Sequence, residues 1–254
     1  MDNVEIQIVS FHKDLGWCEY ALRSIQKFAT GFAGVTLVVP DGEVRLFAPF
    51  QKRFGVKLFP YKVRPGKAML HHMVMKCRAD ETCLNADHIL HMDSDCVFIE
   101  PVTPDDYFVL GKPVLLREKF SEIAKYCPAR CKWQAIVEKT LGFKPEYEMM
   151  VRHPAVHFKW LYRLFRDLVW GRHHKPFDEY VLGCSEVPLG FTEFPALGAV
   201  ALKYHEIAYH WVDAKSPHTD FDLCKAVGVK EKMRQFWSHA GVEKHKEELE
   251  KILG

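Results

Sequence analysis

The first hundred residues alternate between short apolar runs and segments whose apolar side chains recur at helical spacing. Residues 5–11 (EIQIVSF) predict a strand, and residues 15–28 predict a helix. Further strands are predicted at 35–40, 55–59 and 88–92, and a further helix at 68–83. This alternation is typical of an open, mostly parallel, twisted α/β sheet flanked by helices, which binds its ligand beyond the carboxyl ends of the strands.

The pattern becomes less regular after Pro101. Three more elements are predicted there: a strand at 114–116, an amphipathic helix at 155–170 and a charged helix at 243–253. No repeat and no Gly-, Ser- or Pro-rich linker divides the chain. We therefore expect one domain over residues 1–254, with a Rossmann-like half at 1–110 and an irregular half at 111–254.

The composition is that of a globular protein. The chain has 254 residues, of which 48% are hydrophobic and 27% charged, enough to bury a large core. It has no apolar run of membrane-spanning length and no signal-peptide pattern, so we expect a soluble, cytoplasmic protein without a membrane span. Six of the eight cysteines have apolar neighbours, and Cys127 and Cys131 lack the second pair of a zinc site, which favours reduced thiols.

The charges are distributed unevenly. The net charge is +2, but residues 117–175 hold 13 Lys and Arg against 6 Asp and Glu. The basic residues include a stripe at helical spacing and an upstream group beside an aromatic ring: Lys159, Arg163 and Arg166, and Arg130 and Lys132 beside Trp133. Positive charge mixed with aromatic side chains is typical of nucleic-acid-binding surfaces, although a solvated helix face shows the same pattern.

Two aspartates follow the predicted strand at 88–92. Asp93 and Asp95 are two positions apart, so in extended backbone both carboxylates project to one side. Hard oxygen donors at the carboxyl end of a strand suit Mg²⁺ or Mn²⁺ bridging a diphosphate. A second Asp-x-Asp, Asp220-Phe-Asp222, lacks the preceding apolar strand, and we interpret it as a helix cap.

These features together resemble the GT-A glycosyltransferases. The resemblance rests on the opening strand with Ser10-Phe11-His12, the following helix, a second strand ending in Val-Pro, and the run ADHILHMDSDCVFIEPV. It covers about the first 110 residues, and fragments persist at 191–194 (FTEF) and 236–241 (FWSHAG). It implies a GT-A fold and transfer of a sugar from a nucleotide-sugar, a UDP-sugar in our interpretation, with Mn²⁺ or Mg²⁺ as cofactor.

The resemblance also implies roles for individual residues. Asp95 would bind the metal, Asp93 would reach the ribose or the metal, and His239 or His210 would complete the metal shell. The remaining residues expected to bind the nucleotide-sugar are Phe11, Asp14, Lys67, Lys76 and Ser94. A helix cap for Asp14 and a solvated helix face for each lysine are the alternative interpretations.

An inverting enzyme needs a carboxylate that accepts the acceptor's proton. Glu193, flanked by Phe191 and Phe194, is the first candidate, followed by Asp178 and its neighbour Glu179. The alternative for Glu193 is a buried carboxylate hydrogen-bonded to backbone. The histidine pairs at 71–72 and 173–174 have no metal-site spacing, so we expect them to pack or to lie on the surface.

The acceptor is open to several interpretations. Bacteriophage glycosyltransferases modify hydroxymethylated pyrimidines in DNA, and the basic second half favours such an acceptor, whose base would have to be flipped out. Glycan or glycolipid synthesis is the alternative. A haloacid-dehalogenase-like phosphatase would also carry ILHMDSDCVF, but on its first strand, whereas here other predicted strands precede it. A non-enzymatic nucleic-acid-binding protein would leave the paired aspartates unexplained.

Overall fold

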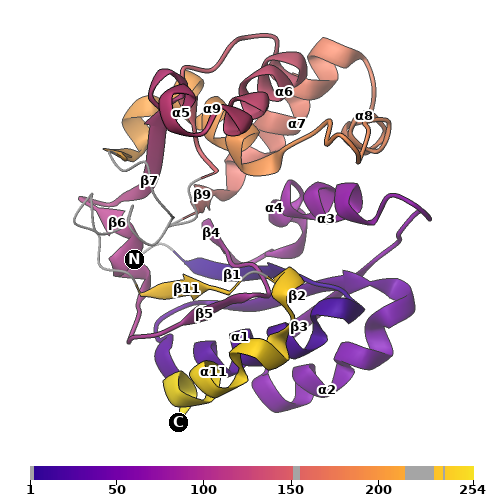
Figure 1. Cartoon of the computed structure of the whole chain (residues 1–254), viewed down its shortest axis with the longest axis vertical. Coiled ribbons are helices and arrows are strands. Elements are labelled where there is room, and N and C mark those ends of the chain that lie inside the picture. Colours follow the sequence, from indigo (N-terminus) through magenta and orange to yellow (C-terminus); the bar gives the residue numbers. More distant parts are fainter. Residues whose placement is uncertain (1–2, 151–154, 215–231, 237) are drawn as a thin grey trace. The chain divides into compact units, whose positions relative to one another are not determined.

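The computed structural model describes residues 3–150, 155–214, 232–236 and 238–254 (Figure 1). The Asp220-Phe-Asp222 motif and Cys224 lie outside these residues. The chain divides into two compact units, and each combines segments that are distant in sequence. The first unit contains Met1–Val63, Glu81–Asp106 and Glu231–Gly254, and the second contains Arg64–Asp80 and Tyr107–Lys230.

A parallel sheet forms the centre of the first unit. β1 (Val4–Val9) lies between β2 (Gly34–Pro40) and β4 (His88–His91), and β3 (Lys57–Tyr61) pairs with β2. Every residue of β1 is buried, as expected for a strand covered on both faces. The four strands predicted in this region are confirmed, and so is an α/β architecture with a mostly parallel sheet flanked by helices.

Helices connect these strands. α1 (Leu15–Phe28) follows the short 3-10 turn η1 (His12–Asp14) and has the predicted bounds. The turn η2 (Asp41–Glu43) leads into α2 (Val44–Phe54), which the sequence did not predict. α2 ends at Gly55, whose φ of +67° is a left-handed conformation that glycine adopts without steric cost.

The C-terminal segment completes the first unit. β11 (Met233–Gln235) pairs antiparallel with β5 (Cys96–Phe98). It is followed by η6 (Ser238–Ala240), η7 (Val242–His245) and α11 (Lys246–Leu253). Leu249 and Leu253 of α11 join a buried cluster with Trp17 and Phe236. Residues from both ends of the chain therefore share one core.

The second unit contains a smaller mixed sheet and most of the remaining helices. β7 (Lys112–Lys119) pairs antiparallel with β6 (Phe108–Val109) and β8 (Tyr147–Glu148), and parallel with β10 (His210–Asp213). The helices are α3 (Ala68–Lys76), α5 (Phe120–Tyr126), α6 (Lys132–Leu141), α7 (Lys159–His173), α8 (Phe177–Leu182) and α9 (Glu193–His205). The short elements of this unit are η4 (Pro128–Cys131) and η5 (Glu206–Ala208), while η3 (Pro104–Tyr107) and α4 (Ala79–Thr82) each contain residues of both units.

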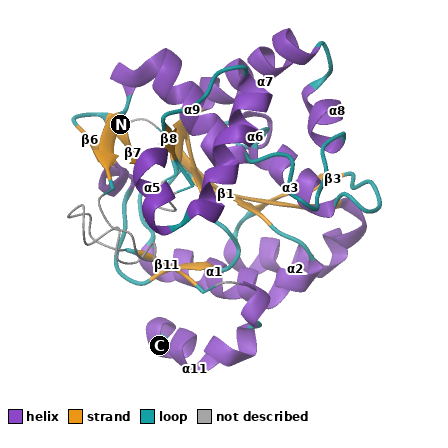
Figure 2. Cartoon of the chain, turned by 45° about the horizontal axis from the view of Figure 1, so that its top comes forward, coloured by secondary structure: helices purple, strands orange, loops and turns teal. Residues whose placement is uncertain are grey.

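Three helices form the core of the second unit. α6, α7 and α9 pack against one another (Figure 2). The rings of Phe165, Phe177 and Phe191 lie with their centroids 5.4–6.4 Å apart in this core. Leu161 and Phe165, on the apolar face of the amphipathic helix predicted at 155–170, are therefore buried as expected.

Three sequence predictions need correction at element boundaries. The helix predicted at 243–253 is α-helical only from Lys246, after the 3-10 turn η7. The helix predicted at 155–170 begins only at Lys159, because Val156–Phe158 forms the short strand β9. The helix predicted at 68–83 ends at Lys76 and is followed by the separate four-residue α4. None of the described helices is long and apolar enough to span a membrane.

Candidate functional site

Carboxylates gather at one end of the sheet in the first unit. β1 and β4 are parallel neighbours, so the loops that follow them meet at the same edge. Asp14 lies in the loop after β1, and Asp93, Ser94 and Asp95 follow β4. The Ser94 hydroxyl donates a hydrogen bond to Asp14 Oδ2 (3.3 Å), which links the two loops. The structure thus brings together four of the residues expected to bind a metal and nucleotide.

The Asp95 side chain is held by the C-terminal segment. The backbone N–H of Ser238 donates to Asp95 Oδ2 (2.7 Å), and Gln235 Nε2 donates to Asp95 Oδ1 (3.0 Å). The backbone N–H of Phe236 also donates to the Asp95 carbonyl oxygen (2.9 Å). The carboxylate is buried, and the contacts from Ser238 and Gln235 hold its two oxygens. Gln235 and Ser238 were missed in the sequence because nothing local marks them as partners of a residue about 140 positions away.

Negative charge is concentrated at this site. The pKa of Asp14 is raised from 3.8 to about 6, first by burial and then by the charges of Asp95 and Asp93. The hydrogen bond from Ser94 and the charge of His12 act in the opposite direction. Carboxylates that raise the pKa of a neighbouring acid favour a nearby cation, because a cation stabilises the ionised form of that acid.

The donor set fits a metal held jointly by protein and substrate. Within the described ranges, no three His, Cys, Asp or Glu side chains are arranged to coordinate one ion. Mg²⁺ is commonly bound by one or two carboxylates together with substrate phosphates, so Asp93 and Asp95 suffice for that mode. His239 follows Ser238 and is exposed, whereas His210 lies on β10 in the second unit.

The ends of β1 and β2 add a second pair of side chains. Glu43, after β2, accepts hydrogen bonds from the backbone N–H of His12 (Oε2, 2.6 Å) and contacts its Nδ1 (Oε1, 2.6 Å). The Phe11 ring meets the His12 ring edge-on, with centroids 5.7 Å apart. Glu43 therefore fixes the orientation of His12 beside the half-buried Phe11, and Glu43 is a residue that the sequence did not single out.

The candidate base Glu193 is buried in the second unit. It is the first residue of α9, and its Oε1 lies 3.1 Å from the buried Lys76 Nζ of α3. The Lys76 ammonium also lies 4.6 Å from the centroid of the Phe194 ring. The alternative interpretation of Glu193 as a buried carboxylate holds, but its partner is a lysine side chain. The same ion pair means that Lys76, expected to contact phosphate, here donates to Glu193.

The other predicted residues of the second unit also have protein partners. Asp178 forms an ion pair with Arg78 (2.8 Å), and Lys67 Nζ donates to the Cys184 carbonyl oxygen (2.8 Å). His71 accepts a hydrogen bond from the backbone N–H of Arg64 (2.8 Å). The expected packing role of this histidine is therefore observed.

The basic residues that predicted a nucleic-acid-binding surface include two arginines that are held by carboxylates, one in the stripe and one in the upstream group. Arg166 donates to both carboxylate oxygens of Asp80 (2.6 and 2.8 Å) and is largely buried. Arg130 forms an ion pair with the fully buried Glu148 (2.5 Å). Arg163 of the stripe is exposed, and it lies 3.8 Å from Asp167. Helical spacing placed Arg163 and Arg166 on one helix, but it could not show which of them meets a carboxylate from another element.

No protein-family model matches the sequence, and no curated protein is detectably similar to it. The chemistry of the site therefore carries the functional inference.

Proposed function

We propose that the protein is a metal-dependent GT-A glycosyltransferase that moves a sugar from a nucleotide-sugar, a UDP-sugar, to an acceptor hydroxyl. The observation that supports this proposal is the group Asp14, Asp93 and Asp95 at the carboxyl ends of two adjacent parallel strands. Open α/β sheets bind nucleotides at this edge. Asp93 and Asp95 would hold Mn²⁺ or Mg²⁺, with His239, the residue after Ser238, as the expected imidazole.

The reaction needs a stabilised leaving group. Departure of a nucleoside diphosphate develops negative charge, which a divalent cation neutralises as a Lewis acid. The residues of this chain orient the cation's ligands: Ser238 and Gln235 hold Asp95, and Ser94 links its loop to Asp14. Phe11, beside the oriented His12, would contact the nucleoside.

For proton removal from the acceptor we propose Glu193, with Asp178 as the second candidate. The support for Glu193 is that Lys76 balances its charge while its second oxygen, Oε2, is buried and accepts no hydrogen bond from the described residues. The hypothesis of a DNA acceptor loses part of its support, because Arg130 forms an ion pair with Glu148 and Arg166 forms one with Asp80. Hydroxymethylated DNA, glycans and glycolipids are therefore all tested as acceptors.

The test is a thermal-shift panel with UDP, GDP, CMP and UDP-sugars, each with and without Mn²⁺. A ligand at a hundredfold excess over its Kd stabilises the folded state by about 2.7 kcal/mol, which raises Tm by a few degrees. We expect a metal-dependent shift with one nucleotide class in the wild type and in Asp105→Asn, whose aspartate is exposed on η3. The metal-dependent shift should be lost in Asp95→Asn.

A shift that survives in Asp95→Asn, or no shift with any nucleotide, would contradict the proposal. Release of phosphate from phosphomonoesters without any nucleotide shift would favour a phosphatase instead. If the nucleotide shift is found, transfer of the sugar to hydroxymethylated DNA, oligosaccharides and glycolipids identifies the acceptor.

A further inference from the structure

A two-residue turn in the second unit carries an unexpected side chain. Leu110 and Gly111 join β6 to β7, with Val109 paired to Lys112 across the hairpin. Both turn residues have positive φ, +51° and +74°, as a type I′ turn requires. Asn-Gly is the usual choice there, because leucine in a left-handed conformation costs about 1–2 kcal/mol. The Leu110 side chain is 97% exposed, so packing within the unit does not offset that cost.

A second exposed aliphatic side chain lies at the same end of this sheet. β10 runs parallel to β7 and its first residue, His210, pairs with Val114. The segment that enters β10 and the turn that enters β7 therefore lie beyond one end of the two strands. Ile207, in η5 immediately before β10, is 85% exposed. The exposed side chains of Leu110 and Ile207 thus lie on neighbouring loops at one end of this sheet.

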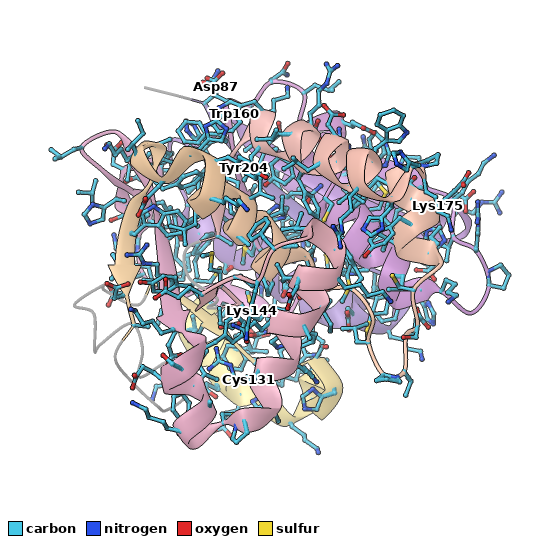
Figure 3. The ribbon with its side chains drawn as sticks, turned by 90° about the horizontal axis from the view of Figure 1, so that it is seen from above. Asp87, Cys131, Lys144, Trp160, Lys175 and Tyr204 are labelled. Carbon is cyan, nitrogen blue, oxygen red and sulfur yellow. The ribbon has the colours of Figure 1, made fainter. Side chains whose placement is uncertain are left out.

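Two aromatic side chains adjoin these connections. Trp160, in the first turn of α7, is 42% exposed, and its ring lies 4.4 Å from the ring of His205, which directly precedes η5. Tyr204, the neighbour of His205 on α9, is also exposed (Figure 3). We call Val109, Leu110, Trp160, Tyr204 and Ile207 together the apolar rim.

Exposed cations flank the apolar rim. Lys112 adjoins the hairpin turn, Lys203 adjoins Tyr204, and Arg163 lies one turn along α7 from Trp160. Glu206 lies 3.9 Å from Arg117, which also donates to Asp213 (2.7 Å), and Asp167 lies 3.8 Å from Arg163. Each acid therefore lies beside an arginine, while Lys112 and Lys203 add positive charge at the rim.

We propose that the apolar rim docks on the surface of an anionic lipid membrane. Exposed aliphatic side chains on convex turns, amphipathic Trp and Tyr, and flanking Lys and Arg are the features of proteins that lie at a membrane interface. Single-stranded nucleic acid would need flat rings in a basic groove, and leucine and isoleucine offer bases no stacking surface. This docking is independent of the nucleotide chemistry proposed for the first unit.

The test is co-sedimentation with vesicles of phosphatidylcholine alone and of phosphatidylcholine mixed with phosphatidylserine. We expect the wild type to bind the mixed vesicles and to be released by salt. Leu110→Asn and Ile207→Asn should each weaken binding about tenfold or more, because each removes one inserted aliphatic side chain. Val187→Asn is the matched control, since Val187 is 92% exposed but precedes the opposite end of α9.

Leu110→Asn separates docking from folding. Because asparagine tolerates the left-handed conformation, this variant should have an equal or higher Tm than the wild type. Its binding to the mixed vesicles should nevertheless be weakened. Absence of wild-type binding to the mixed vesicles would overturn the proposal. Equal loss in Val187→Asn, or a wild-type dimer that Leu110→Asn dissociates in place of vesicle binding, would also overturn it.

Discussion

The ion pair between Lys76 and Glu193 joins two residues that are both nearly inaccessible to solvent, with side chains 7% and 6% exposed. Removing one member of such a pair leaves an uncompensated buried charge. We therefore expect Lys76→Met and Glu193→Gln each to lower the free energy of unfolding by about 3–5 kcal/mol, measured by urea denaturation. The combination Lys76→Met with Glu193→Leu should recover most of that loss.

The exposed pair Arg163 and Asp167 provides the control for this prediction. Asp167→Ala should change the free energy of unfolding by less than about 0.5 kcal/mol, because solvent screens the pair. If the two buried single variants cost no more than Asp167→Ala, the ion pair contributes nothing to the stability of the second unit.

Asp14 makes the stability of the first unit depend on pH. Its pKa of about 6 in the folded protein exceeds its ordinary value of 3.8, so the folded state holds a proton that the unfolded state has lost. The resulting stabilisation is present below about pH 4 and is lost as the pH rises through about 6. We expect Asp14→Asn to be more stable than the wild type above about pH 7 and equal to it near pH 4.

Urea denaturation of both proteins at the two pH values measures this difference. Groups that titrate identically in the wild type and the variant contribute equally to both free energies of unfolding, so their contributions cancel in the difference. A stability difference that is the same at both pH values would show that Asp14 does not titrate with a raised pKa.

At the scale of elements, Gly198 of α9 packs closely against Met149, the residue after β8. This contact leaves no room for a side chain at Gly198. A Cβ there would lie 2.8 Å from Met149 Cβ. Although alanine favours helices by about 1 kcal/mol over glycine, we expect Gly198→Ala to destabilise the protein by about 1–3 kcal/mol in urea denaturation. In a Met149→Gly background, which lacks the Cβ as well as Cγ and Sδ, Gly198→Ala should lose this penalty.

Gly171 in α7 is the matched helical glycine. A Cβ at this position has open space around it, so Gly171→Ala should stabilise the protein by about 0.5–1 kcal/mol. Destabilisation by Gly171→Ala equal to that by Gly198→Ala would contradict the contact with Met149.

The elements that the sequence predicted well are those whose signal is local. α1 has apolar residues at helical spacing between Asp14 and the glycines that follow it, and its bounds were predicted to the residue. α9 was missed because its middle is apolar on every side and so has no amphipathic period. β11 was missed because three residues carry almost no pattern, and the strand exists through its pairing with β5, more than 130 positions earlier.

The candidate site follows the same rule. Asp93 and Asp95 were predictable because a buried strand precedes them, and the apolar neighbours of Glu193 indicated its burial. Their partners could not be predicted: Gln235 and Ser238 for Asp95, and Lys76 for Glu193. Each of these contacts joins segments more than 110 positions apart. A pairing of that kind is decided by the tertiary fold and leaves no periodic signal in the sequence.

At the scale of the whole molecule, the chain passes between the two units more than once, so no single cut separates them. A fragment of residues 1–110 lacks residues 232–254, which supply Phe236, Leu249 and Leu253 to the core around Trp17. We expect this fragment to show no cooperative thermal unfolding by circular dichroism. The same fragment joined by a flexible linker to residues 232–254 should unfold cooperatively. A cooperative transition in the fragment alone would contradict this view of the core.

The contribution of residues 232–254 to the first unit also orders its assembly during protein synthesis. Although the first unit includes residues 1–63, its core and the contacts of Asp95 need residues that the ribosome translates after those of the second unit. The segments of the second unit emerge before that point and can fold as a unit earlier. A nascent chain that stalls before residue 232 would therefore expose the edge of β5 and the surroundings of Trp17. Such a chain is a substrate for chaperones, and it has not yet formed the carboxylate site.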